Sequence, residues 1–416
     1  MYTENIQEQA IASGCSLRNQ ITEIADALYQ NKEEVRSSGL LVGDAGITLF
    51  FAHLASIYPG GKYENITHEY LEKLSHALSH EELSWDMSSG IAGIAFVFQH
   101  LRNIGLLDPS EDLNLSALDE AISMGADRDF GEGKWDPLHG LTGLGIYFIE
   151  RHRETGETKY LEKIVDQLVA LSSLEKGCRV WVTPGYRHYS NNNYNFGMAH
   201  GMPGLLSFLA QIYALGIRQD AIAAIMPSCV SFLLAHSNDQ EKWYTFPGSI
   251  EIASTPGGTP KLLPSRHGWC YGDLGMAVAL IHCGKALDRD GWTRMGIDIA
   301  LQTTLIPFEY TRCGDAPFCH GAVGLVHQYH RLYQATGDNQ FKEAARQWLD
   351  ITRDHYYRPG AYAGGYAYRR YDEAEEKPEF ISAYGLLEGI AGIGLVFLTC
   401  QHIVKPDWDI IFQTNI

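Results

Sequence analysis

The sequence contains no long uninterrupted hydrophobic run. Its longest apolar stretch, Gly385 to Leu398, is shorter than the ~18 residues that a membrane span needs, and it carries Glu388. The first residues, Met1 to Gln9, show neither a basic segment nor an apolar core of the kind found in secretory signals. We therefore expect a cytoplasmic protein without direct membrane insertion, whose eight cysteines stay reduced and act as metal ligands, nucleophiles or core residues.

Basic residues are few relative to acidic ones. The chain has 32 Lys and Arg against 50 Asp and Glu, a formal net charge of −18 at pH 7. Such a surface repels phosphate backbones and anionic lipid, so nucleic acid is not an expected partner. With 45% hydrophobic and 20% charged residues among 416, the composition is that of a globular protein with a large core, which excludes a disordered chain.

Glycine, by contrast, is abundant, with 42 residues, and it recurs in a pattern. Seven Gly-x-x-Gly pairs are each followed by an apolar helical run, and their first glycines lie 47 to 71 residues apart. This spacing holds two helices and their connections, so each unit is predicted to be one helical hairpin. The pairs are Gly43/Gly46, Gly90/Gly93, Gly140/Gly143, Gly201/Gly204, Gly272/Gly275, Gly321/Gly324 and Gly389/Gly392.

These repeats predict an all-α fold in a single domain that spans residues 1–416. Glycines three apart at a helix N-terminus would let hairpin pack closely against hairpin. Because neither end of the array shows a polar capping repeat, we favour a closed α/α toroid (barrel) of seven helical hairpins over an open solenoid. Short β-like stretches at 179–183, 243–246 and 362–368 are predicted to form hairpins or loops at one mouth of the toroid.

Reactive residues gather directly before the glycines of repeats three to seven. Cys270 and Cys319 both lie two residues before the first glycine, in neighbouring repeats, and His320 follows Cys319. Equivalent positions of a repeat face the same place, so the three side chains are expected to converge. Zn²⁺ prefers thiolate and imidazole ligands, and three protein ligands leave one tetrahedral position open, as in catalytic zinc sites. The alternative is that all three are packing residues.

The remaining cysteines do not share this position. Cys313, six residues before Cys319, is a candidate substitute ligand or a plain loop residue. Cys178 is expected in a loop. The residues predicted to lie in the core are Cys15, Cys229, Cys283 and Cys400.

Three polar residues near the glycines are acid/base or charge-stabilising candidates: His200, Asp136 and Arg266. Their structural alternatives are a helix cap or packing residue, a partner of a helix dipole and a structural ion pair, respectively. Asp86 occupies the position equivalent to Asp136 without a reactive neighbour, and we interpret it as structural.

The position next to the first glycine holds two more polar side chains, His139 and Glu388. Both are candidates to line the cavity.

The motifs Trp269-Cys270-Tyr271-Gly272, Cys319-His320-Gly321 and His200-Gly201-x-x-Gly204, set within seven glycine repeats, resemble the lanthionine synthetase C-like family. The resemblance covers essentially the whole chain. It implies an α/α toroid with zinc in a central cavity, and in the stand-alone bacterial members a cyclase that closes thioether rings in precursor peptides. Tyr271 after the cysteine is similar to the bacterial cyclases, whereas eukaryotic relatives more often show His there.

By this resemblance, one Zn²⁺ per chain is held by Cys270, Cys319 and His320. The implied reaction is Michael-type addition of substrate cysteine thiols to dehydroalanine or dehydrobutyrine. His200 is then the acid/base residue and Asp136 orients it or raises its pKa. Arg266 stabilises the enolate or the anionic site, with Tyr271 as a hydrogen-bond donor.

The same resemblance implies the partners. The substrate is a dehydrated precursor peptide, and since the chain lacks the large dehydratase region of bifunctional synthetases, a separate dehydratase must supply it. An export transporter is a further candidate partner, which would hold the protein at the membrane periphery.

Two other functions fit the same residues. One is addition of glutathione or another free thiol to dehydroamino acids in proteins. The other is a zinc-stabilised, non-enzymatic binding scaffold, whose metal would be closed by a fourth protein ligand such as Cys313 or His267.

Overall fold

The structure is a computed structural model that describes residues 17–108, 114–184, 192–237, 242–253, 259–372, 377–401 and 404–416. Helices dominate it. The α-helices are α2 (Arg18–Gln30), α3 (Asp44–Ile57), α4 (Lys62–His80), α5 (Ile91–Asn103), α6 (Leu115–Glu132), α7 (Leu141–Thr155), α8 (Lys159–Leu171), α9 (Met202–Ala214), α10 (Gln219–Leu234), α11 (Asp273–Ala286), α12 (Asp290–Thr303), α13 (Ala322–Thr336), α14 (Asn339–Asp350) and α15 (Ile390–Cys400).

The strands are short. They are β1 (Ser173–Glu175), β2 (Cys178–Val180), β3 (Asn193–Asn195), β4 (Ser249–Glu251), β5 (Lys261–Leu263), β6 (Tyr368–Asp372) and β7 (Lys377–Ile381). The short helical turns are η1 (Lys32–Glu34), η2 (Phe308–Tyr310), η3 (Ile351–Tyr356), η4 (Ala363–Gly365) and η5 (Asp407–Phe412).

Each of the seven glycine pairs starts a helix, as the repeat predicts. The first glycine is the N-cap of α3, α5, α7, α9, α11, α13 and α15. These helices are buried nearly all round: in α3 every residue from Asp44 to Leu54 is buried. The helix that follows is amphipathic, and α4 buries only one face. The core therefore surrounds the helices that begin at the glycines.

In repeats one, two, three, six and seven, the loop before the helix caps it with backbone groups. In repeat six, the Ala322 N–H donates to the Asp315 carbonyl (3.0 Å) and the Val323 N–H donates to the Ala316 carbonyl (2.9 Å). Repeat one has the same two bonds, from Asp44 and Ala45 to the carbonyls of residues 37 and 38. Helix N-terminal N–H groups need acceptors, and here the loop carbonyls supply them, so the loop side chains remain available for chemistry.

Two neighbours leave no room for a Cβ at these glycines. One is the loop of the same repeat, and the other is the adjacent hairpin. A Cβ on Gly43 would overlap the Ser37 carbonyl, and a Cβ on Gly46 would overlap the Leu40 carbonyl. The same Cβ on Gly46 would lie 2.7 Å from Leu386 Cβ of the seventh repeat. Close approach of hairpins, which we predicted, is thus confirmed, but the repeat's own folded loop is the tighter constraint.

The chain divides into two compact units. The first comprises residues up to Ile122 together with Gly314–Trp408, and it holds repeats one, two, six and seven. The second comprises Ser123–Cys313 together with Asp409–Ile416, and it holds repeats three, four and five. The single domain over 1–416 stays a prediction.

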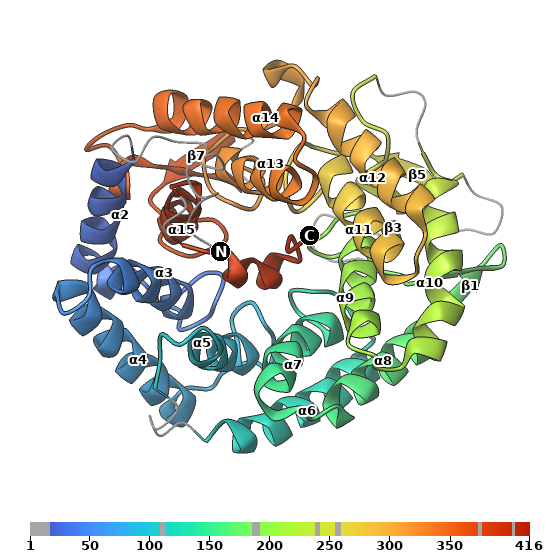
Figure 1. Cartoon of the computed structure of the whole chain (residues 1–416), viewed down its shortest axis with the longest axis horizontal. Helices are drawn as coiled ribbons and strands as arrows, with labels where there is room; N and C mark the ends of the chain where they lie inside the picture. Colours follow the sequence, from blue (N-terminus) through green and yellow to red (C-terminus); the bar gives the residue numbers. More distant parts are fainter. Residues whose placement is uncertain are drawn as a thin grey trace. The chain divides into compact units, whose positions relative to one another are not determined.

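Within the first unit, the last repeat packs on the first. Helix α15 lies beside both α2 and α3 (Figure 1), and the Leu387 N–H donates to the Leu41 carbonyl at 2.9 Å. In the order of the chain, α15 is not followed by a second α-helix in the described residues, and α2 takes that place beside it. Contact between the first and last repeats is expected of a closed array and not of an open solenoid.

The three β-like stretches form strands in part and loops or turns elsewhere, as predicted. The stretch 179–183 contributes Arg179 and Val180 to β2 and a single β-bridge at Thr183. The stretch 243–246 forms no strand, because the Asp273 carboxylate accepts the N–H groups of Thr245 (2.7 Å) and Phe246 (3.1 Å), which a strand would use in its ladder. The stretch 362–368 is mostly the turn η4, and β6 begins only at Tyr368.

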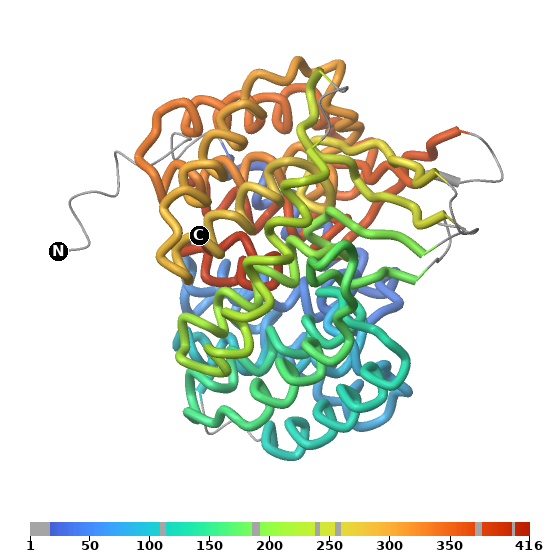
Figure 2. The backbone as a smooth tube through the Cα atoms, turned by 90° about the vertical axis from the view of Figure 1, so that its right-hand side faces the viewer, coloured from blue at the N-terminus to red at the C-terminus, as the bar shows by residue number. Residues whose placement is uncertain are grey.

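The strands form small antiparallel sheets. In the second unit β3, β4 and β5 pair in that order, with Asn195 opposite Ser249 and Ser249 opposite Leu263. These strands project from the helices of their unit (Figure 2). In the first unit β6 pairs with β7.

The core positions predicted for three cysteines are confirmed, and the loop predicted for Cys178 is wrong. Cys229, Cys283 and Cys400 are buried and unpaired as thiols, as expected of core residues. Cys178 lies in strand β2 and not in a loop, because β2 pairs with β1 around the turn at 176–177. Cys15 lies outside the described residues. Among the helices of the described ranges, none has the length and apolar character needed to cross a membrane.

Candidate functional site

Backbone hydrogen bonds join several of the positions two residues before the first glycine to the same position of a neighbouring repeat. In the first unit the N–H donates to the carbonyl at the same position of the next repeat, from Cys319 to Leu387 (3.0 Å), from Leu387 to Leu41 (2.9 Å) and from Leu41 to Ser88 (2.9 Å). In the second unit the Ala199 N–H donates to the Cys270 carbonyl (3.4 Å). Within each unit, equivalent positions therefore lie side by side, as the repeat predicts.

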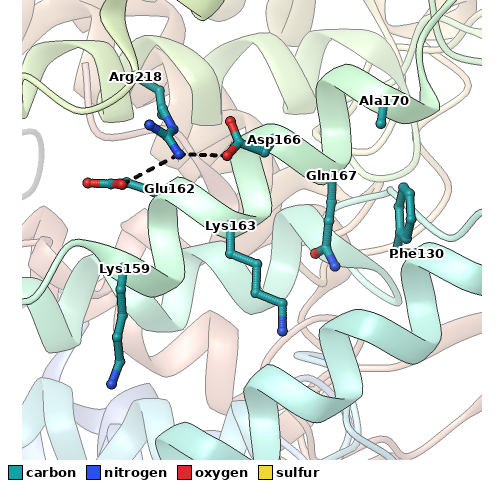
Figure 3. Close-up of a pocket in the computed structure, with 8 residues that line it drawn as sticks. All are labelled: Phe130, Lys159, Glu162, Lys163, Asp166, Gln167, Ala170 and Arg218. Atoms are coloured by element: carbon teal, nitrogen blue, oxygen red, sulfur yellow. Dashed lines mark hydrogen bonds and ion pairs between the residues drawn. The ribbon is translucent and has the colours of Figure 1, made fainter.

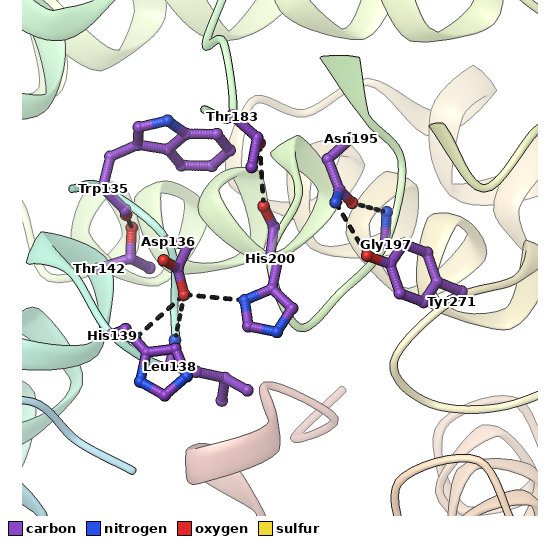
Figure 4. A network of polar contacts seen from close by, with 10 residues as sticks. All are labelled: Trp135, Asp136, Leu138, His139, Thr142, Thr183, Asn195, Gly197, His200 and Tyr271. Atoms are coloured by element: carbon purple, nitrogen blue, oxygen red, sulfur yellow. Dashed lines mark hydrogen bonds and ion pairs between the residues drawn. The ribbon is translucent and has the colours of Figure 1, made fainter. Parts of the chain in front are cut away.

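His200 and Asp136 form a hydrogen-bonded pair in the second unit. His200 Nδ1 lies 3.2 Å from Asp136 Oδ1 (Figure 4). The side chains are 35% and 20% exposed, so the pair is open to a substrate. When Nδ1–H is donated to a carboxylate, the neutral imidazole presents Nε2 as its proton-accepting atom. The ring of His139 stacks on that of His200, with 5.7 Å between the centroids.

Asp136 is also a turn residue, whereas the structural alternative considered for it was a partner of a helix dipole. Its Oδ1 accepts the backbone N–H groups of Leu138 (2.9 Å) and His139 (3.0 Å). Burial raises the pKa of Asp136, but the hydrogen bond and charge of His200, together with His139, outweigh it and hold the pKa below its ordinary value. The carboxylate is thus ionised and fixed in direction by its own turn.

Asp86 makes the corresponding turn in repeat two. Its Oδ1 accepts the Ser89 N–H at 2.8 Å, and its Oδ2 accepts the Ser84 hydroxyl at 2.5 Å. This arrangement agrees with the structural role that we predicted for Asp86.

Tyr271 is held by a residue that the sequence analysis did not identify. Asn195 Nδ2 donates to the Tyr271 hydroxyl at 3.0 Å, and Asn195 Oδ1 accepts the Gly197 N–H at 2.9 Å (Figure 4). Because the amide is the donor in this bond, the phenol oxygen of Tyr271 is the acceptor, and Asn195 fixes its position.

Arg266 precedes Tyr271 in a tight loop. Gly272 has φ of +128°, a conformation that L side chains rarely adopt, and a Cβ there would overlap the Arg266 carbonyl. The side chain of Arg266 is half-buried. No acidic group of the described residues lies within ion-pair distance of it, so the structural ion pair considered for Arg266 is absent in that part of the chain.

The three predicted metal ligands form a group. Of the His, Cys, Asp and Glu side chains that the structure describes, Cys270, Cys319 and His320 offer ligand atoms that all lie within 4.8 Å of one another. Cys270 is buried, and the His320 side chain is 19% exposed. Neither Cys313 nor His267 is part of this group in the described ranges. His267 is 2% exposed, and burial lowers its pKa to about 3.

Two residues beside His320 were missed. Asp315 Oδ2 lies 3.9 Å from His320 Nε2, and the ring of Tyr368 lies 6.1 Å from the imidazole, centroid to centroid. Burial, and then the neighbouring Glu388 with which the hydroxyl is hydrogen-bonded, raise the pKa of Tyr368. Glu388, predicted to line the cavity, therefore contacts a residue that lies against His320.

A signal for Asp315 and Asn195 exists in the repeat. Both lie six residues before the first glycine, where repeat five has Arg266, and the sequence analysis did not extend the comparison of repeats to that position. Tyr368 has no such signal because its place depends on β6.

A groove of about 440 Å³ lies elsewhere in the second unit, on α6, α8 and the residue before α10 (Figure 3). Its charged groups are already paired: Arg218 with Asp166 (2.7 Å) and with Glu162 (3.5 Å). None of the predicted site residues lines it. The groove is separate from the candidate site.

Comparisons with known proteins agree with the repeat pattern. The model of the family described as lanthionine synthetase C-like protein matches residues 34–413. The nisin biosynthesis protein NisC of Lactococcus lactis subsp. lactis is 23% identical over 307 residues, which are 69% of this chain and 72% of that protein. A solved structure of nisin cyclase matches with a TM-score of 0.75 and 19% identity, over 95% of this chain and 97% of that chain. The likeness shows that this chain has the predicted fold, an α/α toroid.

Proposed function

Since the chain belongs to the lanthionine synthetase C-like family, we propose that it is a zinc-dependent peptide cyclase. It adds cysteine thiols of a dehydrated precursor peptide to dehydroalanine or dehydrobutyrine and so forms lanthionine or methyllanthionine rings. The observation that carries this proposal is the grouping of Cys270, Cys319 and His320, which occupy adjacent positions in the repeat.

These residues fit a zinc ion. Two thiols and one imidazole are the donors that Zn²⁺ takes in proteins, and three protein ligands leave a position for a substrate atom. Bound zinc would supply thiol activation: a thiol of pKa near ~8.5 is mostly protonated at neutral pH, and coordination deprotonates it. Cys319 lies three residues before α13, where the positive end of the helix dipole further favours a thiolate.

His200 moves the protons. In the addition, sulfur forms a bond to Cβ while the C=C electron pair shifts toward the carbonyl, and the resulting enolate is then protonated at Cα. One proton leaves the thiol and one is added to carbon, so a single acid/base group at His200 Nε2 serves both transfers. The hydrogen bond from Nδ1 to Asp136 holds the ring with Nε2 available.

Arg266 and Tyr271 stabilise the developing enolate oxygen in this proposal. The guanidinium supplies a positive charge, and Asn195 fixes the Tyr271 hydroxyl, whose O–H group is a donor by its chemistry. Donors fixed before the reaction lower the barrier because they need no reorganisation during it.

The two alternatives are less well supported. A closed structural site would need a fourth protein ligand, yet Cys313 and His267 do not join the group in the described part of the chain. Glutathione addition has no observation of its own here. A separate dehydratase and an export transporter remain proposed partners, and the cytoplasm the proposed location.

The test begins with metal content. Purified protein should contain about one zinc per chain by mass spectrometry, and Cys319→Ala and His320→Ala should lose it while staying folded. Cys313→Ala is the matched control, because this cysteine lies six residues away and outside the group. Well-folded wild-type protein without zinc would contradict the proposal.

The second step is a cyclisation assay. Zinc-loaded protein and a dehydrated precursor peptide should consume peptide thiols without a change in peptide mass, which alkylation followed by mass spectrometry measures. Equal addition of free glutathione to the peptide would favour the alternative transferase.

A further inference from the structure

The immediate surroundings of His320 contain a buried carboxylate that the proposed mechanism does not use. The Asp315 side chain is only 1% exposed. An ionised carboxylate out of water is costly unless charged or hydrogen-bonding partners compensate for it. The contacts of the Asp315 carboxylate therefore indicate its role.

Asp315 has two such contacts in the first unit. Its Oδ2 accepts the backbone N–H of Arg369 at 3.0 Å, at the beginning of β6. The same oxygen lies 3.9 Å from His320 Nε2. The carboxylate thus connects the strand β6 with the imidazole of the candidate metal ligand.

The backbone fixes this carboxylate before any ligand binds. The Asp315 carbonyl caps α13 through the Ala322 N–H, and a Cβ at Gly321 would lie 2.7 Å from Asp315 Oδ1. Side chain and main chain are therefore packed against the residue that follows His320. Tyr368, the residue before Arg369, places its ring beside the same imidazole.

The two imidazole nitrogens are thereby distinguished. Nε2 faces Asp315, so Nδ1 is the atom directed elsewhere. Histidines that bind metals usually donate their other ring N–H to a carboxylate, carbonyl or water, which fixes the tautomer and makes the ligand more basic.

We propose that Asp315 is a positioning residue for the metal ligand His320. Its carboxylate, 3.9 Å from Nε2, attracts the Nε2–H of His320 electrostatically and so leaves Nδ1 for the metal, and it is itself held by the Arg369 N–H of β6. This inference rests on the zinc site of the proposed function. A contribution to stability alone, through the loop and β6, is the competing explanation.

Zinc affinity separates the two explanations. Full-length wild type and Asp315→Asn are loaded with Zn²⁺, and the dissociation constant is measured by competition with a chromophoric chelator. The variant should bind zinc about 10- to 100-fold more weakly, the usual effect of losing such an outer carboxylate. The matched control is Asp44→Asn, a carboxylate of similar burial at the start of α3 whose partner is Lys73 at 2.8 Å. It should lower the melting temperature and leave zinc affinity unchanged.

Zinc affinity of Asp315→Asn within twofold of wild type would overturn the proposal while leaving the zinc site intact. Wild type that binds no zinc through Cys319 and His320 would instead overturn the proposed function and this inference with it. If Asp315→Asn does not fold, the histidine tautomer in zinc-loaded wild type decides. Long-range ¹H–¹⁵N correlation on histidine-labelled protein should show a protonated Nε2 and a metal-bound Nδ1 for His320, and the reverse assignment would overturn the proposal.

Discussion

Asp136 and Asp86 occupy the same position in neighbouring repeats and accept backbone N–H groups of the same turn. Their side chains differ in the other hydrogen bonds that they make. Asp136 also accepts from His200, whereas the side chain of Asp86 bonds to serines of its own loop. Both carboxylates thus serve the same turn, and Asp136 in addition bonds to an imidazole.

Replacing Asp136 by Asn should impair catalysis far more than folding. The amide can still accept the backbone N–H groups of Leu138 and His139, but it no longer favours Nδ1–H on His200. We expect cyclisation turnover to fall by about 10²-fold or more, within the range that acid/base groups contribute. Asp86→Asn should show a similar change in melting temperature and near wild-type turnover. Equal turnover of the two variants would refute the role of Asp136.

Residues within the repeat were predictable from the sequence, whereas their outer neighbours were only partly so. Cys270, Cys319 and His320 could be grouped because the glycines set their register. Asp315 shares its position in the repeat with Asn195 and Arg266, whereas Tyr368 has no counterpart in the repeat. Tyr368 approaches His320 only because a hydrogen bond between Arg369 and Asp315 places the strand β6, and that contact joins residues 54 positions apart.

At the scale of elements, the helices that begin at the glycines bury polar residues inside apolar faces. His53 of α3 is 4% exposed, and in the described part of the chain its Nε2 has no hydrogen-bond partner. Burial, and then the nearby His100, lower the pKa of His53 to about 3. This histidine is therefore neutral in the folded protein over the whole physiological range.

The lowered pKa of His53 should make the protein sensitive to mild acid. The unfolded chain takes up a proton near pH 6.5 and the folded protein does not, so the free energy of unfolding falls as pH drops below 6.5. At pH 5 the loss from this group is about 2 kcal/mol. In urea unfolding at pH 7 and pH 5, His53→Leu should lose about 2 kcal/mol less than wild type between the two values.

His80→Gln, on the exposed end of α4, serves as the control for this measurement. The same loss between pH 7 and pH 5 in His53→Leu and wild type would show that His53 does not cause the acid sensitivity.

The starts of the helices were predictable from the sequence, whereas which β-like stretches pair as strands and which form loops was not. A glycine pair marks a helix start because the folded loop leaves no room for a Cβ, which is a local requirement. The stretch 243–246 has the composition of a strand, yet its N–H groups go to Asp273 some 27 residues later. Hydrogen bonds from these N–H groups to a carboxylate distant in sequence produce no periodic pattern from which they could be predicted.

At the scale of the whole molecule, the net charge of −18 has a consequence for the proposed substrate. An acidic protein attracts a cationic peptide through its summed field, and salt screens that attraction.

Binding of a positively charged dehydrated peptide should therefore weaken with ionic strength. We expect kcat/KM to fall by about an order of magnitude between 0.05 and 0.5 M salt, measured with one peptide at constant pH. A peptide variant with zero net charge should show little change. A flat response of the cationic peptide would contradict electrostatic attraction.

The toroid fold itself was predictable, because seven repeats and the absence of polar caps point to closure. Which helices close the array was not predictable from the sequence. The repeat count assigns two helices to every glycine pair, but α15 is accompanied by α2, from the other end of the sequence. Only the packing of α2 on α15 reveals this exchange.

The pairing of α2 with α15 also dictates an order of events during synthesis. Some 360 residues separate Gln30 from Ile390, so α2 leaves the ribosome long before its partner exists. Its apolar face, with Ile21, Ile24 and Leu28, must meanwhile stay exposed or rest on temporary neighbours. Contacts so distant in sequence form slowly, and exposed apolar faces invite aggregation. Closure of the first unit is therefore a late step in the synthesis of this protein. The nascent chain is most prone to aggregation just before α15 emerges from the ribosome.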